Sequence, residues 1–171
     1  MAAVMAAGTD SALGLRRLFT YGTLMTGFSR RPLLGEAILE GLGRIRGSLY
    51  HFGEYPGVVL DSRGWVYGEL YRVPDLPARL PVLDREEWFD PADETRSLYV
   101  RRALPVHGVG DEVREAWVYE YNERFGAAIG RGPRVESGDW RAHLAGASGH
   151  TVPNVPTAPR APTVPTMEDP R

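Results

Sequence analysis

The sequence predicts an α+β domain whose strands form a small barrel or a strongly twisted sheet. Short runs that alternate apolar and polar residues follow one another closely, and only one segment has a convincing helical period. The length supports a single domain, because 171 residues are enough for one packed core and 43% of them are hydrophobic. Together these observations favour a strand-rich fold with few helices.

The expected strands are rich in aromatic and β-branched residues and are bounded by glycine or proline. Short connections such as residues 61–64 favour antiparallel pairing between neighbouring strands. The expected strands cover residues 18–21, 44–50, 65–72, 98–106 and 116–121.

The expected helix spans residues 75–88 and carries a carboxylate on its apolar face. Leu76, Leu80 and Leu83 recur at helical spacings, and the next position on that stripe is Glu87. Pro81 disturbs a helix interior, which favours a regular helix that begins only near this residue. Whether the helix begins at residue 75 or near Pro81, Leu83 and Glu87 share one face.

Charge and composition exclude several classes of function. The net charge of −2 gives no footprint for nucleic acid or an anionic membrane surface, and no run approaches the length of a membrane span. The chain has no cysteine and its 20 basic residues are all arginine, which excludes disulfides, thiolate nucleophiles and Schiff-base lysines. The four histidines lack ligand spacing, so we expect no metal site.

The two ends of the chain differ from its middle. Residues 1–15 form an apolar leader without the basic start of a secretory signal, so we expect a cytoplasmic protein. In residues 145–171 proline recurs about every third position, which denies the chain helix and strand hydrogen bonds. We therefore expect disordered ends around one domain of residues 16–144. A second interpretation is that the tail docks on a partner in polyproline conformation.

The first expected strand ends in an informative turn. Tyr21, Gly22, Thr23 and Leu24 place a glycine and a small hydroxyl residue where the backbone must turn. Consecutive N–H groups in such a turn can cradle a carboxylate or an oxyanion. Composition alone favours the other interpretation, an ordinary glycine turn.

Glu87 is the candidate acid/base group. In an apolar pocket, burial raises the pKa of a carboxyl toward neutrality, where it accepts and returns a proton efficiently. The alternative is that Glu87 bends out to solvent at the helix end and pairs with Arg85 or Arg101. Asp84, one turn earlier, is better placed to bond backbone, to cap a loop or to pair with Arg101.

A Tyr-Gly-Thr-Leu turn at residues 21–24, followed by Leu-Asp-Arg-Glu-Glu at residues 83–87, resembles the γ-glutamylcyclotransferase-like superfamily. Its members carry a Tyr-Gly-(Thr or Ser)-Leu loop after the N-terminal strand and a Leu-Asp-x-x-Glu segment downstream. Further stretches of this chain are similar to the family's later strands and to its ending, and the resemblance covers residues 17–144. These stretches are residues 55–59, 66–71, 97–101, 117–121 and 137–141.

The resemblance implies a small mixed barrel with a central cavity, and an enzyme that uses no metal or organic cofactor. The implied partner is a small-molecule γ-glutamyl amine or γ-glutamyl peptide, from which 5-oxoproline is released. Glu87 then corresponds to the proton-transfer residue, and the backbone N–H groups of the turn hold the glutamyl end. The candidate substrate-binding residues are Tyr21, Gly22, Thr23 and Leu24, together with two strand tyrosines, Tyr99 and Tyr121.

Trp88 and Phe89 depart from the family pattern, in which glycine commonly follows the glutamate. A bulky pair at this point narrows or reshapes the pocket entrance, and the polar loop at residues 90–95 is a candidate for substrate choice. The pair also supports a second hypothesis, a non-catalytic module that binds a ligand in the cavity without turnover. A third hypothesis is an interaction protein that acts through its tail.

Overall fold

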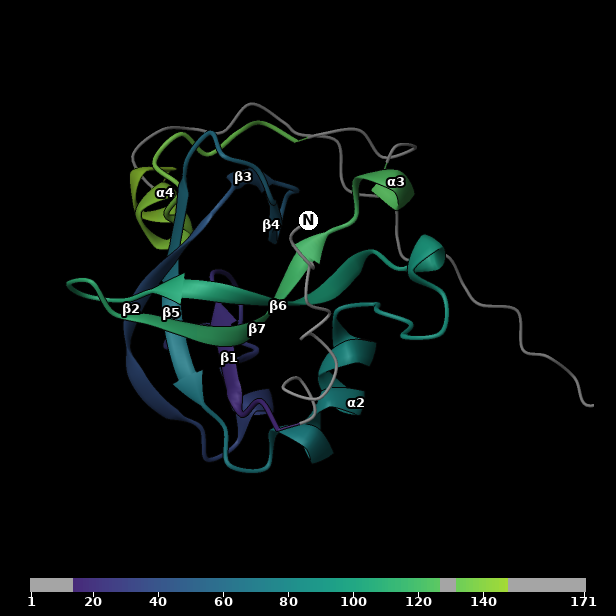
Figure 1. Ribbon diagram of the computed structural model, residues 1–171. Helices are drawn as coiled ribbons and strands as arrows, with labels where there is room; N and C mark the ends of the chain where they lie inside the picture. The colour runs from purple at the N-terminus through teal and green to yellow at the C-terminus, as the bar shows by residue number, and fades with distance from the viewer. Residues whose placement is uncertain (1–13, 127–131, 148–171) are drawn as a thin grey trace, which may run out of the picture.

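The computed structural model describes residues 14–126 and 132–147 (Figure 1). The expected leader and tail therefore lie almost wholly outside the described residues, and so do residues 127–131. In the described part of the chain, no helix is both long and apolar enough to cross a membrane. In chain order the elements are β1 (Arg17–Thr20), η1 (Arg31–Leu34), β2 (Ile38–Arg46), β3 (Ser48–His51), β4 (Pro56–Val59), β5 (Trp65–Arg72), α2 (Leu76–Glu86), η2 (Glu94–Arg96), β6 (Tyr99–His107), β7 (Val113–Tyr121), α3 (Glu123–Gly126) and α4 (Trp140–Ala147).

Five strands close into a barrel in the order β1-β5-β2-β6-β7, and β3 pairs with β4 in a separate two-stranded sheet. The barrel is mixed, because β1 runs parallel to β7 at the Leu18–Trp117 pair while the other neighbours are antiparallel. Strands β2 and β6 meet at one pair, Arg44 with His107. The α+β barrel expected from the sequence is confirmed.

The expected strand at residues 44–50 is wrong in one respect, because the structure divides it at Gly47. Residues before this glycine belong to the barrel, and residues after it belong to the small sheet. A Cβ at Gly47 would lie 2.8 Å from the carbonyl oxygen of Val59, so only glycine fits where the two sheets meet. The alternation of side chains continues across the break and gives no sign of it.

The helix α2 runs unbroken through Pro81, so the expectation that it begins near this residue is wrong. Its first turn contains Pro77, where a missing N–H is tolerated, and Pro81 removes one further internal donor. The apolar face is as expected, since Leu76 and Leu83 are fully buried and Leu80 packs beside them. Burial of this face against the barrel outweighs the proline, and it fixes the direction in which the helix ends.

Neighbouring residues of the barrel strands point to opposite sides and enter two packed clusters. Leu18 belongs to the cluster that includes Leu83 of α2, whereas Phe19 belongs to the cluster that includes Trp140 of α4. The helices α2 and α4 accordingly lie on opposite sides of the barrel (Figure 1). This packing brings the end of β1 and the end of α2 to the same cavity.

Candidate active site

A cavity lies where β1 ends, and its wall combines segments that are distant in sequence. It is lined by residues 19–24 from β1 and the following turn, by Arg30, by residues 55–56 before and at the start of β4, by residues 86–88 at the end of α2, and by Leu98, Tyr99 and Tyr119. The floor is mostly buried, whereas Trp88 is 44% exposed at the mouth. The expected turn and the expected carboxylate therefore meet in one place.

The turn after β1 presents unused backbone donors. Met25 N–H bonds to the carbonyl of Gly22 at 3.1 Å, and Arg30 N–H bonds to that of Thr23 at 3.2 Å. The N–H groups of Gly22, Thr23 and Leu24 have no acceptor among the residues that the structure describes. A Cβ at Gly22 would lie 2.6 Å from Pro56, so the close approach of this proline requires glycine. Consecutive N–H groups without an acceptor are the kind of backbone arrangement that can bind an anion.

Glu87 is the C-cap residue of α2, and its carboxylate lines the cavity. Within the described part of the chain it accepts no hydrogen bond and pairs with no arginine, unlike the alternative in which Arg85 or Arg101 binds it. Burial raises the pKa of Glu87 to about 7, the nearby charge of Arg30 lowers it, and Glu86 raises it. A carboxyl with this pKa can exchange a proton near neutral pH.

Asp84 lies one turn before Glu87 and is held on both oxygens. Arg101 Nη1 donates to Oδ1 and Oδ2 at 2.9 and 3.0 Å, and the Tyr119 hydroxyl donates to Oδ1 at 2.7 Å. Burial raises the pKa of Asp84, while the Tyr119 hydrogen bond and the Arg101 charge lower it. The expected pairing with Arg101 is present, and Asp84 joins α2 to strands β6 and β7.

The three tyrosines expected at the site have different positions. Tyr21 donates to the carbonyl of Tyr119 at 2.6 Å, and Tyr99 donates to the carbonyl of Pro56 at 2.6 Å, so both hydroxyls brace the cavity wall. Burial raises the pKa of each of these two phenols. Tyr121 does not line this cavity and packs edge-on against Tyr99, with ring centroids 5.8 Å apart. The structure thus brings Tyr21 and Tyr99 to the cavity and leaves Tyr121 behind them.

Thr20 is a cavity residue that the sequence did not single out. Its side chain is 3% exposed, and its hydroxyl has no hydrogen-bond partner among the described residues. A buried hydroxyl without a partner lowers stability, and this one belongs to a residue that lines the cavity. The position of Thr20 directly before Tyr21 was the sequence signal that could have identified it. Arg30 and Tyr55 carried no such signal, because loops bring them to the mouth.

The turn is fixed to the barrel by a buried carboxylate, Glu69 of β5. Its Oε2 accepts from Thr26 N–H at 2.7 Å and from the Tyr71 hydroxyl at 2.5 Å. Its Oε1 accepts from Arg141 of α4 at 2.9 Å, and the same guanidinium donates to the carbonyl of Thr26 at 2.9 Å. Both sides of Thr26 are therefore held, which limits movement of the segment that follows Leu24.

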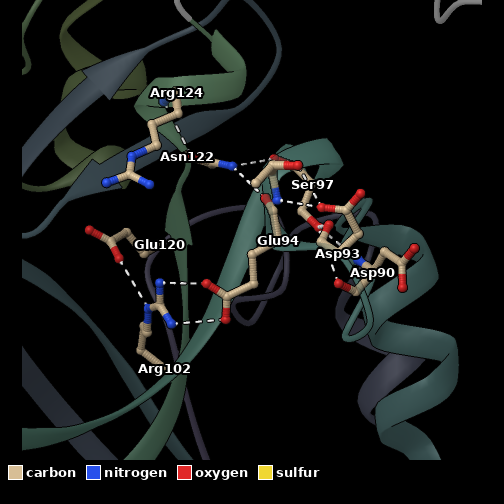
Figure 2. Close-up of polar contacts among 9 residues, drawn as sticks. Asp90, Asp93, Glu94, Ser97, Arg102, Glu120, Asn122 and Arg124 are labelled. Carbon is tan, nitrogen blue, oxygen red and sulfur yellow. Dashed lines mark hydrogen bonds and ion pairs between the residues drawn. The ribbon is translucent and has the colours of Figure 1, made fainter.

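The polar loop after Phe89 is fixed by its own contacts, as Figure 2 shows. Ser97 Oγ accepts from Asp90 N–H at 2.8 Å, and Asn122 donates to the carbonyls of Glu94 and Ser97, both at 2.8 Å. Arg102 makes a forked pair with Glu94 at 3.0 and 2.9 Å. Residues 90–95 do not line the cavity, so the structure does not bring this candidate loop to the site.

The cavity of this mixed barrel is lined by Glu87, whose carboxylate is unpaired among the described residues, and by a turn with three N–H groups that have no acceptor there. Residues 18–142 match the family described as gamma-glutamyl cyclotransferase, AIG2-like. The chain belongs to this family. No curated protein matches the chain in a direct sequence search.

Solved structures from bacteria and mouse are similar to this fold. YkqA from Bacillus subtilis has a TM-score of 0.59 and 26% identity over 79% of this chain, which spans 43% of YkqA. Protein ytfP from Escherichia coli has a TM-score of 0.50 and 30% identity over 75% of this chain and 98% of its own. An AIG2-like protein from Mus musculus has a TM-score of 0.50 and 25% identity over 62% of this chain and 76% of its own.

Proposed function

We propose that this protein is a cyclotransferase that releases 5-oxoproline from a γ-glutamyl amine or γ-glutamyl peptide, with Glu87 as the general acid/base. The observation that carries the proposal is the Glu87 carboxylate, which is unpaired among the described residues, faces the cavity and has a pKa of about 7. Membership in the gamma-glutamyl cyclotransferase family supports the choice of reaction.

The first chemical step is a proton transfer. The α-amine of a γ-glutamyl group is an ammonium near neutral pH and cannot attack its own γ-carbonyl. Glu87 removes one proton, and the free amine nitrogen then forms a bond to the γ-carbonyl carbon. Because both reacting groups belong to one molecule, holding them in attack geometry contributes roughly 7–11 kcal/mol at most to lowering the barrier.

The second step breaks the γ-amide bond. Glu87 delivers its proton to the leaving nitrogen, and the carbon–nitrogen bond breaks as the tetrahedral intermediate collapses. The ring nitrogen passes its extra proton to Glu87, which releases it to solvent or to the departing amine. The products are 5-oxoproline and the amine, and the carboxylate is regenerated.

The turn and its neighbours would orient the glutamyl end. The free N–H groups of Gly22, Thr23 and Leu24 suit the α-carboxylate or the oxyanion that develops on the γ-carbonyl. Thr20, whose buried hydroxyl has no partner among the described residues, lines the same cavity. Tyr21 and Tyr99 keep the wall in place through their bonds to backbone carbonyls. All of these groups are side chains or backbone atoms of this chain.

The test is release of 5-oxoproline from a panel of γ-glutamyl amines and γ-glutamyl amino acids. We expect Glu87→Gln to lower kcat by roughly 10²–10⁴-fold, because the amide cannot carry the proton. The matched control is Glu36→Gln, since Glu36 is exposed and lies outside the cavity. Equal release by native protein and Glu87→Gln would remove Glu87 from the mechanism.

A second candidate function is ligand binding without turnover, and the position of Trp88 at the mouth favours it. In that case γ-glutamyl compounds would raise the melting temperature of the native protein without forming 5-oxoproline. Formation of 5-oxoproline from any compound of the panel would show that the protein is an enzyme and not only a binding module.

A further inference from the structure

The helix α4 is joined to strand β3 by a pair of histidines. Nδ1 of His51 in β3 and Nε2 of His143 in α4 lie 2.8 Å apart, and the two rings meet edge to face. Trp140, which is 1% exposed, packs edge-on against His51 with ring centroids 4.9 Å apart and lies 5.5 Å from His143. Both histidines are half-buried, and neither of them lines the cavity that contains Glu87.

The partners of His51 determine where the hydrogens of both rings lie. Nε2 of His51 is 2.6 Å from the carbonyl oxygen of Gly53, and a carbonyl oxygen can only accept. Nε2 therefore carries the hydrogen, and in the neutral ring Nδ1 of His51 is an acceptor. His143 must then donate from Nε2. With both rings neutral, the contact is a complete hydrogen bond.

The contact tolerates one extra proton but not two. When one ring is an imidazolium and the other is neutral, the charged ring donates and the neutral ring can present an acceptor nitrogen. When both rings are charged, two N–H groups face each other across the contact. Burial lowers the pKa of His143, and the charge of His51 lowers it further. Binding of a second proton therefore opposes the contact between α4 and β3.

The surroundings of the pair offer no carboxylate to offset a second charge. Among the described residues, neither ring has a carboxylate as a hydrogen-bond or ion-pair partner. Arg134 and Glu136 pair with each other at 3.6 Å, and Asp139 accepts from Ala142 N–H at 3.0 Å. The titratable and charged side chains on the segments next to the pair are Tyr50, Glu54, Arg134, Glu136, Asp139 and Arg141.

The same helix carries the arginine that supports the turn of the candidate active site. Arg141, two residues before His143, donates to the carbonyl of Thr26 and to Oε1 of Glu69, both at 2.9 Å. Its guanidinium also lies 5.4 Å from the ring of Phe28. Because Thr26 follows the turn by two residues, the position of α4 affects how firmly the N–H groups of residues 22–24 are held.

We propose that His51 and His143 are positioning residues for the turn at residues 21–24, and that they release α4 when the pair binds a second proton. They act through Arg141 and do not touch the substrate. The turn is then held firmly above the ordinary histidine pKa of 6.5 and less firmly in acid. The expected effect on KM rests on the proposed cyclotransferase function, whereas the coupling between the pair and the turn does not.

The pair also makes stability depend on pH. Below pH 6.5 the unfolded chain binds a proton on each histidine, whereas the folded chain resists the second one. The contribution of the pair to the free energy of unfolding should therefore rise as pH increases to 6.5 and be constant above it. Glu87 contributes with the opposite sign, because its pKa is raised, so the pair is best observed in Glu87→Gln.

The first test uses NMR on the full chain carrying Glu87→Gln. Near pH 8, spectra of the imidazole nitrogens should show hydrogen on Nε2 of both His51 and His143. As pH falls to about 5, the amide signals of residues 22–24 should shift together with the titration of the pair. Adding His143→Gln should abolish these amide shifts, because an amide can donate or accept but binds no proton. Amide shifts that persist in His143→Gln, or that are absent while the histidines titrate, overturn the proposal.

The second test is the KM for the γ-glutamyl compound of the panel with the highest kcat/KM. Between pH 7.5 and 5.5, the KM of the native protein should rise about fivefold relative to that of His143→Gln. His143→Ala, which removes the contact, should have a raised KM at both values with kcat changed by less than about twofold. Glu87 titrates in all three proteins, so the ratio of KM values reports the pair. A ratio that does not change with pH overturns the proposal.

The matched control is His107→Gln. His107 is also half-buried and packs edge-on against a tryptophan, Trp65, at 5.0 Å, but it contacts neither α4 nor the turn. We expect this variant to keep the amide shifts and the KM profile of the native histidine pair, and loss of both would contradict the role of His51 and His143. If no compound is cyclised, the proposed function fails and the NMR test alone decides this inference.

Discussion

Asp84 and Glu87 lie three residues apart at the end of α2, but the two carboxylates have different surroundings in the folded protein. Asp84 points to β6 and β7, where Arg101 and Tyr119 satisfy it within 3.0 Å. Glu87 faces the cavity and has no hydrogen-bond donor among the described residues. Burial raises the pKa of both, and that of Glu87 rises to about 7.

The difference extends to the groups around each carboxylate. On the Asp84 side, polar groups pair with one another and join α2 to the sheet. On the Glu87 side, the Thr20 hydroxyl and three backbone N–H groups also have no partner in the described part of the chain. The polar groups around Asp84 are therefore used by the fold, whereas these groups belong to residues that line the cavity.

The largest effect on stability is expected from Asp84→Ala. This substitution leaves Arg101 without its carboxylate in a site where its side chain is 15% exposed, and we expect a loss of about 3 kcal/mol. Urea denaturation measures the change, and Asp84→Asn, which can still accept from Tyr119, should lose less. The contrast between the two carboxylates would be contradicted if Asp84→Ala lowered the free energy of unfolding by less than Glu87→Gln does.

The next effect is the pH dependence of stability that Glu87 causes. Its pKa is about 7 in the folded state and 4.5 ordinarily, so the folded state binds more protons between these values. The free energy of unfolding should therefore fall as pH rises from 4.5 to 7, by about 1–3 kcal/mol. Glu87→Gln should remove this slope and be more stable than the native protein at pH 8. Identical pH profiles by chemical denaturation would contradict the assignment.

A smaller effect is expected from Glu69→Gln, which weakens the support of the turn without touching the cavity. The amide keeps an acceptor for Thr26 N–H but loses the ion pair with Arg141. We expect a loss of about 1–2 kcal/mol and a rise in KM with little change in kcat, because the N–H row is less well held. A fall in stability with no change in KM would assign Glu69 to the fold alone.

The smallest effect sharpens the comparison most. Thr20→Val replaces an unpartnered hydroxyl by a methyl group of the same shape, and we expect a gain of about 1 kcal/mol in stability. If Thr20 contacts the substrate, KM should rise about fivefold to tenfold in the same variant. Calorimetry and steady-state kinetics test the two halves separately. A loss of stability would show that the hydroxyl contributes to the fold.

Local patterns in the sequence predicted much of this site. The 3.6-residue period placed Glu87 on the face of Leu76 and Leu83, and the structure brings that position to the cavity. The composition of the turn at residues 21–24 predicted exposed N–H groups, because glycine and small residues allow the backbone to turn there. Each of these inferences needs only neighbours within one turn of helix or a few residues of strand.

Tertiary structure decided what depends on distant contacts. The division of residues 44–50 at Gly47 follows from the approach of Val59, and Tyr99 reaches the cavity while Tyr121 does not. Sequence alternation cannot show either result, since it assigns a residue to a face but not to a neighbour. The position of Trp88 at the mouth of the cavity also depends on contacts between segments that are distant in sequence.

The sequence by itself thus determined that a strand-rich domain carries a carboxylate and a turn suited to acid/base chemistry. Only the folded barrel decided which carboxylate is free, because Arg101 and Tyr119 could satisfy Asp84 or Glu87 until β6 and β7 were placed. Hydrogen bonds between residues 17 and 35 positions apart fix that choice, and no local period encodes them. Glu87 has no partner among the described residues because Arg101 and Tyr119 bind its neighbour Asp84 instead.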